Sequence, residues 1–466
     1  MSGYVYELPT TAALSFSELC TDITGSYVAQ LANATEARAN VRAVLKASKR
    51  TDAGERDYLK VVKALDEYLP YVRAIIACVA ADDLTLAQDP IFSWRTTLSS
   101  HTLSSDSPRL NVHGLHAELA FILLTTAYAL SNLSAASVAS LGTYERDRAL
   151  PDSDRRAKDE KLTFAIKLLC RAAGIFTYVA QVVIPEWSKS PAAGSGARPP
   201  DLTKDVVSAL AKLALADAQS LTVRKLLTRS AAESALSPGP PLPKGHPAPS
   251  LVAKLTLHTA SLYTSARSLA DTASRKTSLI KIPGRSADDG SGGQVSQDVR
   301  RYLEDEAALA GALAHKWLGV DAGEAGKTGD AVGYLKWAKG ELEALKEGKI
   351  ARFKKGGGGG DAKMKKERSV EELESVGTFL KNYQKVNDTV QFQPVPSSSA
   401  LQSLIPAGIP IAEERAYEPP MPAFGPGTPD YVARSIERLD VEDGVVTQQP
   451  EPKVDEREYG LKGSYF

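Results

Sequence analysis

Long stretches with apolar residues at helical spacing are the feature that most constrains the fold of this chain of 466 residues. Such spacing runs through residues 16–80, 115–138, 161–183 and 203–227, whereas the strict alternation typical of strands is scarce. The short segment 4–6, Tyr-Val-Tyr, is the best strand candidate. The pattern therefore predicts a mainly α-helical protein in which the apolar helix faces build the core.

The most apolar stretch, residues 117–133, tests whether any of these helices crosses a membrane. It carries Glu118, Thr125, Thr126 and Asn132, which a bilayer span of this length would have to bury in lipid. Overall, hydrophobic residues at 43% and charged residues at 24% are ordinary for a folded globular chain. We therefore expect this stretch to be a helix buried in protein.

Charge and cysteine usage limit the partners and the compartment. The 56 Lys and Arg residues balance 56 Asp and Glu residues, so no surface-wide electrostatic attraction to nucleic acid is expected. Three cysteines, odd in number and far apart, fit reduced thiols of a cytoplasmic protein. The sequence shows neither the apolar run of a signal peptide nor a prenylation motif, so membrane recruitment would need a partner or a local patch.

No set of residues in the sequence forms a recognisable catalytic or metal site. His113 and His116 are three apart, but no nearby carboxylate or cysteine completes a metal-ligand set. Cys170 lies on an apolar helical pattern, which is typical of a small core residue. The glycine run at 356–360 lacks the Gly-Lys-Ser/Thr of a nucleotide-binding loop. We therefore expect no enzymatic activity, no metal and no cofactor.

Four segments rich in Pro, Gly or Ser interrupt the helical pattern. They lie near 188–201, 237–250, 282–294 and 346–368, and we expect them to be loop insertions because they cannot bury enough apolar surface to pack. The last one is also basic. It fits either a solvated insertion or a weak contact with anionic membrane.

Several motifs arrive in the order found in the Bro-one domain family of Alix-like proteins, which the chain resembles from about residue 4 to residue 415. The stretch that ends in Ala-Asp-Ala-Gln is the most specific of them. The motifs are FSW at 92–94, LHAELAFILLTTAYALSNLSA at 115–135, LTFAIKLLCRAAGIFTYV at 162–179, PPDLTKDVVSALAKLALADAQ at 199–219, LVAKLTLHTASLY at 251–263, NDTV at 387–390 and PVP at 394–396.

The resemblance implies a curved, boomerang-shaped helical solenoid with tetratricopeptide-like hairpins and a small β element. We expect this domain to cover residues 1–417, followed by a Pro-rich tail at 418–466 with a short helix capped by Thr428. In the family, a concave groove binds the C-terminal amphipathic helix of the ESCRT-III core subunit of the Snf-seven/Vps-thirty-two type. Such binding needs no catalytic residue.

Five residues fall on the family's groove positions. Asp159 matches an acidic position, Thr222 a position that is usually aromatic, and Leu251 and Leu255 two apolar positions, while Ile411 lies near a further apolar position. The resemblance implies that these side chains line the partner-binding groove.

Thr222 departs from the family pattern, so either the affinity is lower or Leu221 or Val223 replaces the missing aromatic contact. From the residues alone, two leucines four apart on a helix are more typical of a core than of an interface. An aspartate at the start of a helix is likewise explained by the helix dipole. Only the resemblance raises these residues to candidates for binding.

Among the short family members, the beginning and the tail of this sequence most resemble the fungal branch that acts in ambient-pH signalling. This resemblance implies a cytoplasmic adaptor, recruited to cortical plasma-membrane sites or endosomes, that binds ESCRT-III and other pH-signalling components. It would help the proteolytic activation of a PacC-type transcription factor. The alternative is a trafficking adaptor for endosomal cargo or Rho-type signalling with no role in the pH response.

Overall fold

The structure is a computed structural model, and it is mainly α-helical, as the apolar periodicity predicts. It describes residues 3–23, 25–99, 109–189, 198–279, 295–353 and 360–433. The helices are α1 (Phe16–Leu19), α2 (Val28–Arg50), α3 (Tyr58–Ala80), α4 (Leu115–Ala139), α5 (Asp152–Tyr178), α6 (Ile184–Lys189), α7 (Lys204–Leu236), α8 (Pro249–Leu279), α9 (Gln297–Glu324), α10 (Thr328–Phe353), α11 (Gly360–Val386) and α12 (Ser398–Gln402). Short helical turns occur at η1 (Ala53–Glu55), η2 (Tyr144–Arg146), η3 (Val179–Val183), η5 (Pro200–Leu202) and η6 (Asn387–Gln391).

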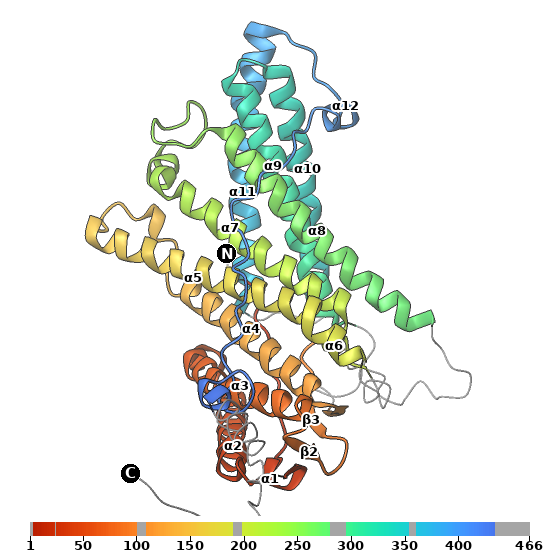
Figure 1. Cartoon of the computed structure of the whole chain (residues 1–466). Helices are drawn as coiled ribbons and strands as arrows, with labels where there is room; N and C mark the ends of the chain where they lie inside the picture. Colours follow the sequence, from red (N-terminus) through yellow and green to blue (C-terminus); the bar gives the residue numbers. More distant parts are fainter. Residues whose placement is uncertain are drawn as a thin grey trace, which may run out of the picture.

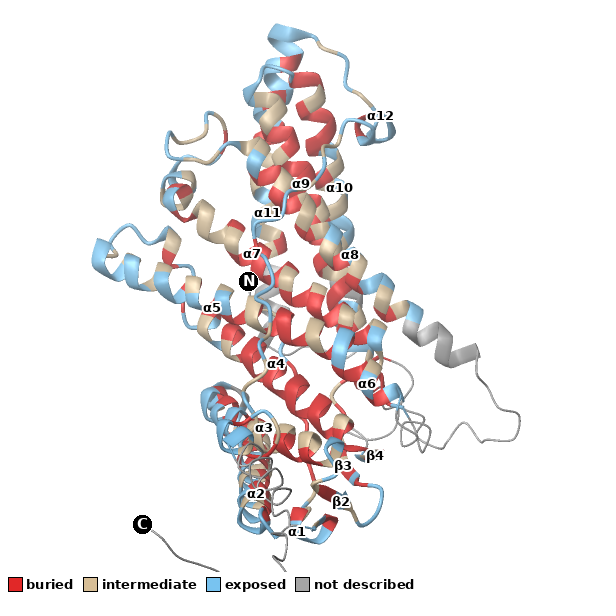
Figure 2. Cartoon of the chain, viewed as in Figure 1, coloured by how far each residue is buried: buried red, intermediate tan, exposed pale blue. Residues whose placement is uncertain are grey.

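The long helices stack side by side in chain order. Each of α2, α3, α4 and α5 packs on the next, α5 packs on α7, and the series continues through α8, α9 and α10 to α11 (Figure 1). Their buried faces form one large apolar cluster from the N-terminal segment to α9 and a second cluster among α9, α10 and α11 (Figure 2). This arrangement confirms the predicted mainly α solenoid.

Helix α4 lies at the centre of the larger cluster and is buried on all sides, as expected for the most apolar stretch. By length and composition alone, three described helical stretches could cross a membrane: Leu115–Arg146, Asp152–Lys189 and Lys204–Leu236. The most apolar windows of these stretches are 89%, 61% and 72% buried inside the protein, respectively. The apolar surface of α4 therefore contacts other helices of the same chain.

The β structure of the described residues consists of two small antiparallel pairs. Strand β1 (Cys20–Asp22) pairs with β2 (Leu84–Leu86), and β3 (Ile91–Arg95) pairs with β4 (Arg109–His113). The strand expected at residues 4–6 is absent, so that prediction is wrong.

The extended backbone of Tyr6 instead bonds to a side chain of α4. Its N–H donates to Asn132 Oδ1 at 2.7 Å, and its carbonyl accepts from Asn132 Nδ2 at 2.8 Å. The Asn132 amide thus satisfies the main-chain groups that a neighbouring strand would otherwise pair with.

A buried polar network ties the N-terminal helices to α4. Glu118 is fully buried, and its Oε1 accepts from Arg38 Nε at 2.9 Å and from the Tyr68 hydroxyl at 3.2 Å. Its Oε2 accepts from Trp94 Nε1 at 2.6 Å. Because a buried carboxylate needs a paired charge and hydrogen-bond donors, these three partners explain why an acidic residue is tolerated in the core.

The first three segments expected to be loop insertions differ in how much of each the structure describes. The segment 188–201 is a connection in which η5 is the only described regular turn after α6 ends, and residues 190–197 lie outside the described chain. The segment 237–250 is a loop up to the start of α8 at Pro249. The segment 282–294 lies outside the described residues.

The expected loop at 346–368 is wrong over most of its length. Helix α10 continues to Phe353 and α11 begins at Gly360, and residues 354–359 between them lie outside the described chain. The flanking sequence is rich in Ala, Glu, Lys and Arg, which are strong helix formers, and this preference outweighs the basic charge that suggested a loop.

The helical stretch expected from residue 203 and the tail helix expected at Thr428 both begin where the sequence predicts. Thr203 occupies the N-cap position of α7, although its side chain makes no capping hydrogen bond. In the tail, a helix begins at residue 429, and Thr428 Oγ1 accepts from the Tyr431 N–H at 3.4 Å. The described part of the tail, residues 418–433, packs on the N-terminal helices, since Phe424 is buried against Tyr27.

Candidate partner-binding site

An extended segment that follows α12 crosses the helical stack and is called the strap here (residues 403–417; Figure 1). On α8, the Lys254 carbonyl accepts from the Ile409 N–H at 3.1 Å, and on α5 the Cys170 carbonyl accepts from the Arg415 N–H at 3.0 Å. A carbonyl has two lone pairs, so one in a helix can accept a bond from the strap as well as its helical bond. The strap is therefore fastened to both helices.

Glycines let the strap approach these helices closely. A Cβ at Gly174 of α5 would lie 1.7 Å from the Arg415 carbonyl oxygen, and a Cβ at Gly408 of the strap would lie 2.5 Å from the His258 backbone nitrogen. Both distances are far below van der Waals contact. Side chains at these two positions would hold the strap away from α5 and α8.

Asp159, the expected acidic groove residue, is half-buried on α5. Its Oδ1 accepts from the Tyr144 hydroxyl at 2.5 Å, and burial together with this bond raises the pKa of Tyr144. Lys158 Nζ lies 5.7 Å from the centre of the Tyr144 ring, and Arg224 pairs with Glu145 at 3.0 Å. The tyrosine that binds Asp159 thus lies near charges of both signs.

Thr222, at the usually aromatic position, is half-buried on α7 and donates to the Ala218 carbonyl of its own helix at 2.8 Å. Lys225, three residues on, donates to the Thr163 hydroxyl of α5 at 2.6 Å. That hydroxyl donates in turn to the Asp159 carbonyl at 2.7 Å. These contacts connect the region around Thr222 to the region around Asp159.

The two predicted leucines have different environments. Leu251 is 39% exposed in the first turn of α8, whereas Leu255 is 1% exposed and packs with Val223 and Val252. The expectation that Leu255 lines a groove surface is therefore not met in this structure. The four-residue spacing alone favours burial. In the structure the face of α8 that carries Leu255 packs against α7.

Ile411 is 50% exposed on the strap, and the side chain that fixes its position is Gln219 of α7. Gln219 Oε1 accepts from the Ile411 N–H at 2.9 Å and from the Ala412 N–H at 3.0 Å. Gln219 Nε2 donates to the Leu255 carbonyl at 3.2 Å and to the Ile409 carbonyl at 2.9 Å. One amide therefore joins α7, α8 and the strap.

The structure brings the five predicted residues into one region of the fold through these contacts, with Leu255 underneath its surface. Sequence reasoning missed Gln219. The available signal is its place at the end of the quoted stretch Ala-Asp-Ala-Gln, where a polar residue follows an apolar helical pattern. A polar side chain at such a position needs buried hydrogen-bond partners, and the strap supplies most of them.

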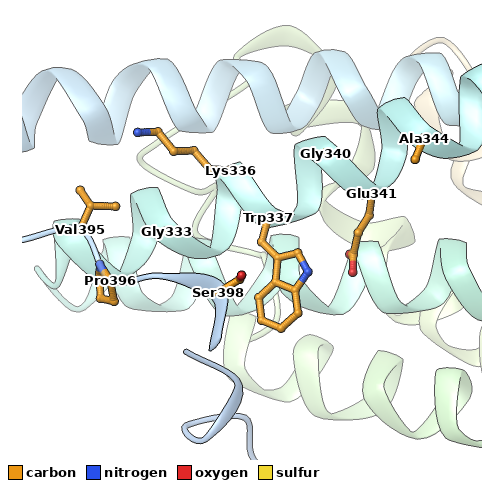
Figure 3. A pocket seen from close by; sticks show the side chains of 9 residues that line it. All are labelled: Gly333, Lys336, Trp337, Gly340, Glu341, Ala344, Val395, Pro396 and Ser398. Atoms are coloured by element: carbon orange, nitrogen blue, oxygen red, sulfur yellow. The ribbon is translucent and has the colours of Figure 1, made fainter. Parts of the chain in front are cut away.

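A pocket lies on α10, separate from this region. Its volume is about 500 Å³, and it is lined by Gly333, Trp337 and Gly340 of α10, with Pro396 beside Gly333 at one end (Figure 3). The Trp337 ring stacks on His315, with 3.8 Å between the ring centres. The pocket is shallow and open, and none of the five predicted residues lines it.

A buried carboxyl group, Asp217, lies on α7 two residues before Gln219. Its Oδ1 accepts from the hydroxyls of Tyr263 at 2.5 Å and Tyr302 at 2.9 Å, and its Oδ2 accepts from the Tyr4 N–H at 3.4 Å. Burial raises the pKa of Asp217 to about 6, and the negative charge of Glu306 adds to the increase. The hydrogen bonds from the two tyrosines act in the opposite direction.

Among the described residues, no group of three or more His, Cys, Asp or Glu side chains could hold a metal ion. His113 Nδ1 pairs with Asp89 at 2.8 Å, and Cys170 is a half-buried thiol whose pKa is raised by burial. Neither arrangement activates a nucleophile. The arrangement that stands out instead is a helical scaffold with a strap fastened across it.

Residues 15–419 match the model of the BRO1-like domain family, and the chain belongs to that family. The pH-response regulator protein palC of Cryptococcus neoformans var. neoformans is 36% identical, with both chains covered over their whole length. The protein of the same description in Emericella nidulans is 29% identical over 92% of this chain and 90% of its own. In Yarrowia lipolytica a third palC is 32% identical over 38% of this chain and 36% of its own length.

Solved structures share the fold at 16% identity. ALIX in complex with the PYKEVTEDL late domain of SIVmac239 superposes with a TM-score of 0.62, over 95% of this chain and 54% of that chain. The ALIX BRO1 domain in complex with CHMP4C gives a TM-score of 0.57 over 91% and 98% of the two chains. This likeness confirms the expected curved helical architecture.

Proposed function

We propose that the protein is a non-enzymatic adaptor of fungal ambient-pH signalling that binds the C-terminal amphipathic helix of an ESCRT-III core subunit. Two relatives that match at least nine-tenths of the chain are named pH-response regulators, which supports the pathway. A BRO1 domain of the same fold has been solved in complex with CHMP4C, which supports an ESCRT-III partner. In this role it would help the proteolytic activation of a PacC-type transcription factor.

The main observation in support of the proposed binding surface is that two apolar side chains near Gln219, those of Leu251 and Ile411, are exposed. Leu251 lies one turn before Leu255, whose carbonyl bonds to Gln219, and Ile411 bonds to the same amide. Thr222 lies one turn along α7 from Gln219. An amphipathic helix laid over this region would bury apolar area that is otherwise exposed to water.

Asp159 lies at the edge of this proposed surface and gives it a fixed charge. A charge at the rim of an interface contributes mainly to orientation and to the rate of association. Its hydrogen bond with Tyr144 holds the carboxylate in place, so a basic residue of the partner helix would meet a preorganised acceptor. Leu255 would support the surface from below rather than contact the partner.

The proposed location is the cytoplasm, with recruitment to cortical plasma-membrane sites or endosomes. A solved BRO1 structure that concerns endosomal targeting shares the fold with a TM-score of 0.53, which supports an endosomal site. The basic sequence at 346–368 would add at most a weak contact with anionic membrane, and other pH-signalling components would bind elsewhere on the protein.

Calorimetric titration of the purified chain with a peptide of the ESCRT-III subunit's C-terminal helix tests the proposal. Leu251→Asp combined with Ile411→Asp should weaken binding at least tenfold, because two charges would enter an apolar contact. Leu59→Asp is the matched control, since Leu59 is 49% exposed on α3, far along the stack. Unchanged affinity of the double variant would exclude this surface.

Deletion of the gene tests the pathway separately from the surface. Loss of growth at alkaline pH, with loss of processing of the transcription factor, is the expected phenotype. Normal alkaline growth would instead favour the alternative adaptor of endosomal cargo or Rho-type signalling.

A further inference from the structure

The amide of Gln219 uses its whole hydrogen-bonding capacity at the strap junction. Its oxygen faces two N–H groups of the strap, and its nitrogen faces two carbonyls, one from α8 and one from the strap. A rotation of the amide by half a turn would oppose donors to donors and acceptors to acceptors. The orientation of the Gln219 side chain is therefore determined by its partners.

These bonds select one register for the strap. In extended backbone successive side chains point to opposite sides, and here Ile411 is 50% exposed while Ala412 is 8% exposed; Ile409 and Pro410 are both exposed. Ala412 packs in a cluster with Leu162 and Leu221 of α5 and α7. A slip of one residue would turn Ile411 into that cluster and Ala412 out to solvent.

Volume and backbone bonding both oppose such a slip. Ala412 is buried in a packed apolar cluster, so an isoleucine in its place would add three carbons there, and the overpacking would cost stability. The slipped strap would also present the wrong sequence of N–H and carbonyl groups to the amide, since residue 410 is a proline without an N–H. The register that pairs Gln219 with the N–H groups of Ile411 and Ala412 therefore keeps Pro410 away from the acceptor oxygen.

We propose that Gln219 is a positioning residue for partner binding: it sets the register of the strap and thereby holds Ile409 and Ile411 outward beside Thr222 and Leu251. This inference rests on the proposed function for its biological meaning. It concerns a residue that contacts the strap and α8 and need not touch the partner at all.

Cysteine labelling tests the register without any partner. In the intact chain, a cysteine introduced by Ile411→Cys should react rapidly with a thiol reagent, and one introduced by Ala412→Cys should be protected. Adding Gln219→Leu should raise the labelling rate at 412 at least tenfold. Gln219→Glu, which keeps the acceptor oxygen but loses the two donated bonds, provides a second variant if Gln219→Leu does not fold.

A double-mutant cycle tests the link to binding. Ile411→Ala should weaken the ESCRT-III peptide roughly fivefold, since a half-exposed isoleucine loses about half of its possible burial. Gln219→Leu should weaken it by a similar factor, and the combined variant should be no weaker than the weaker-binding single variant. If Gln219 had a merely structural role, the two losses of affinity would be independent, and the combined variant would bind the peptide roughly 25-fold more weakly than the unmodified protein.

The outcomes separate the two proposals. Labelling at 412 that does not respond to either Gln219 variant overturns the register assignment, and multiplicative losses of affinity overturn the positioning role. Failure of the unmodified protein to bind the peptide overturns the proposed function, while the labelling result still decides whether Gln219 sets the register. Exposed Leu59→Ala serves as the control in both experiments.

Discussion

Asp217 offers a sharp test of the electrostatics of the core, through the substitution Asp217→Asn. The side chain is buried, and its pKa is raised to about 6 from the usual 3.8 chiefly because burial disfavours the charged form. Asparagine has nearly the same shape and stays neutral. It can accept from the Tyr4 N–H through its oxygen while the Tyr263 and Tyr302 hydroxyls accept from its amide nitrogen.

The sign and magnitude follow from the two pKa values. A carboxyl with a raised pKa in the folded state contributes stability that is fully present below pH 3.8 and is lost as the pH rises through 6. The loss is about 1.4 kcal/mol per pH unit within that window and levels off above it. Between pH 5 and pH 7.5 the unmodified chain should thus lose about 1.4 kcal/mol through Asp217.

Urea unfolding of both proteins at pH 5.0 and pH 7.5 measures this term. Other titrating groups are common to both chains, so the stability of the variant relative to the unmodified protein should increase by about 1.4 kcal/mol from the lower to the higher pH. Asp388→Asn, at an exposed position in η6, is the control and should show no such change. A difference between the two proteins that does not vary with pH would refute the assigned burial of a titrating Asp217.

Two further substitutions test the contacts that hold the fold together. Gly174→Ala should lift the strap, because the new Cβ would lie 1.7 Å from the Arg415 carbonyl oxygen, and amide hydrogen exchange along the strap should speed up; Gly377→Ala, in open space on α11, is the control. Glu118→Gln should destabilise the protein by about 3–5 kcal/mol in urea unfolding, because it leaves the buried charge of Arg38 unpaired. Unchanged hydrogen exchange along the strap in Gly174→Ala, or an unchanged free energy of unfolding in Glu118→Gln, would contradict the corresponding contact.

The helical core could be predicted from the sequence because its signal is local. Helix α4 needs only a run of apolar residues, and its burial follows wherever the chain packs around it. The start of the tail helix at Thr428 was also readable, since a cap and a following proline act within one turn. Prediction from the sequence was wrong where helix propensity favoured a helix but the basic charge suggested a loop. This happened at the end of α10 and at the start of α11.

The binding region depends on long-range contacts and was only partly predictable. The motifs identified the helices that carry Asp159, Thr222 and Leu251. The spacing of Leu251 and Leu255 favours a core position for both, but it does not show that Leu255 is buried while Leu251 is 39% exposed. The role of Gln219 requires knowing that residues almost 200 positions later lie against it. No local pattern contains that information.

The strap also changes how the mechanics of the stack should be understood. In a solenoid each helix pair contacts only its neighbours, so distant pairs respond to one another weakly. Here a single extended segment bonds to α8 at Lys254, to α7 at Gln219 and to α5 at Cys170, and the chain beyond it reaches α3, where the Pro70 carbonyl accepts from Ala423 at 3.1 Å. The position of Ile411 is therefore fixed by contacts along much of the molecule. A partner that binds there meets a surface whose rigidity comes from the strap as well as from the helices beneath it.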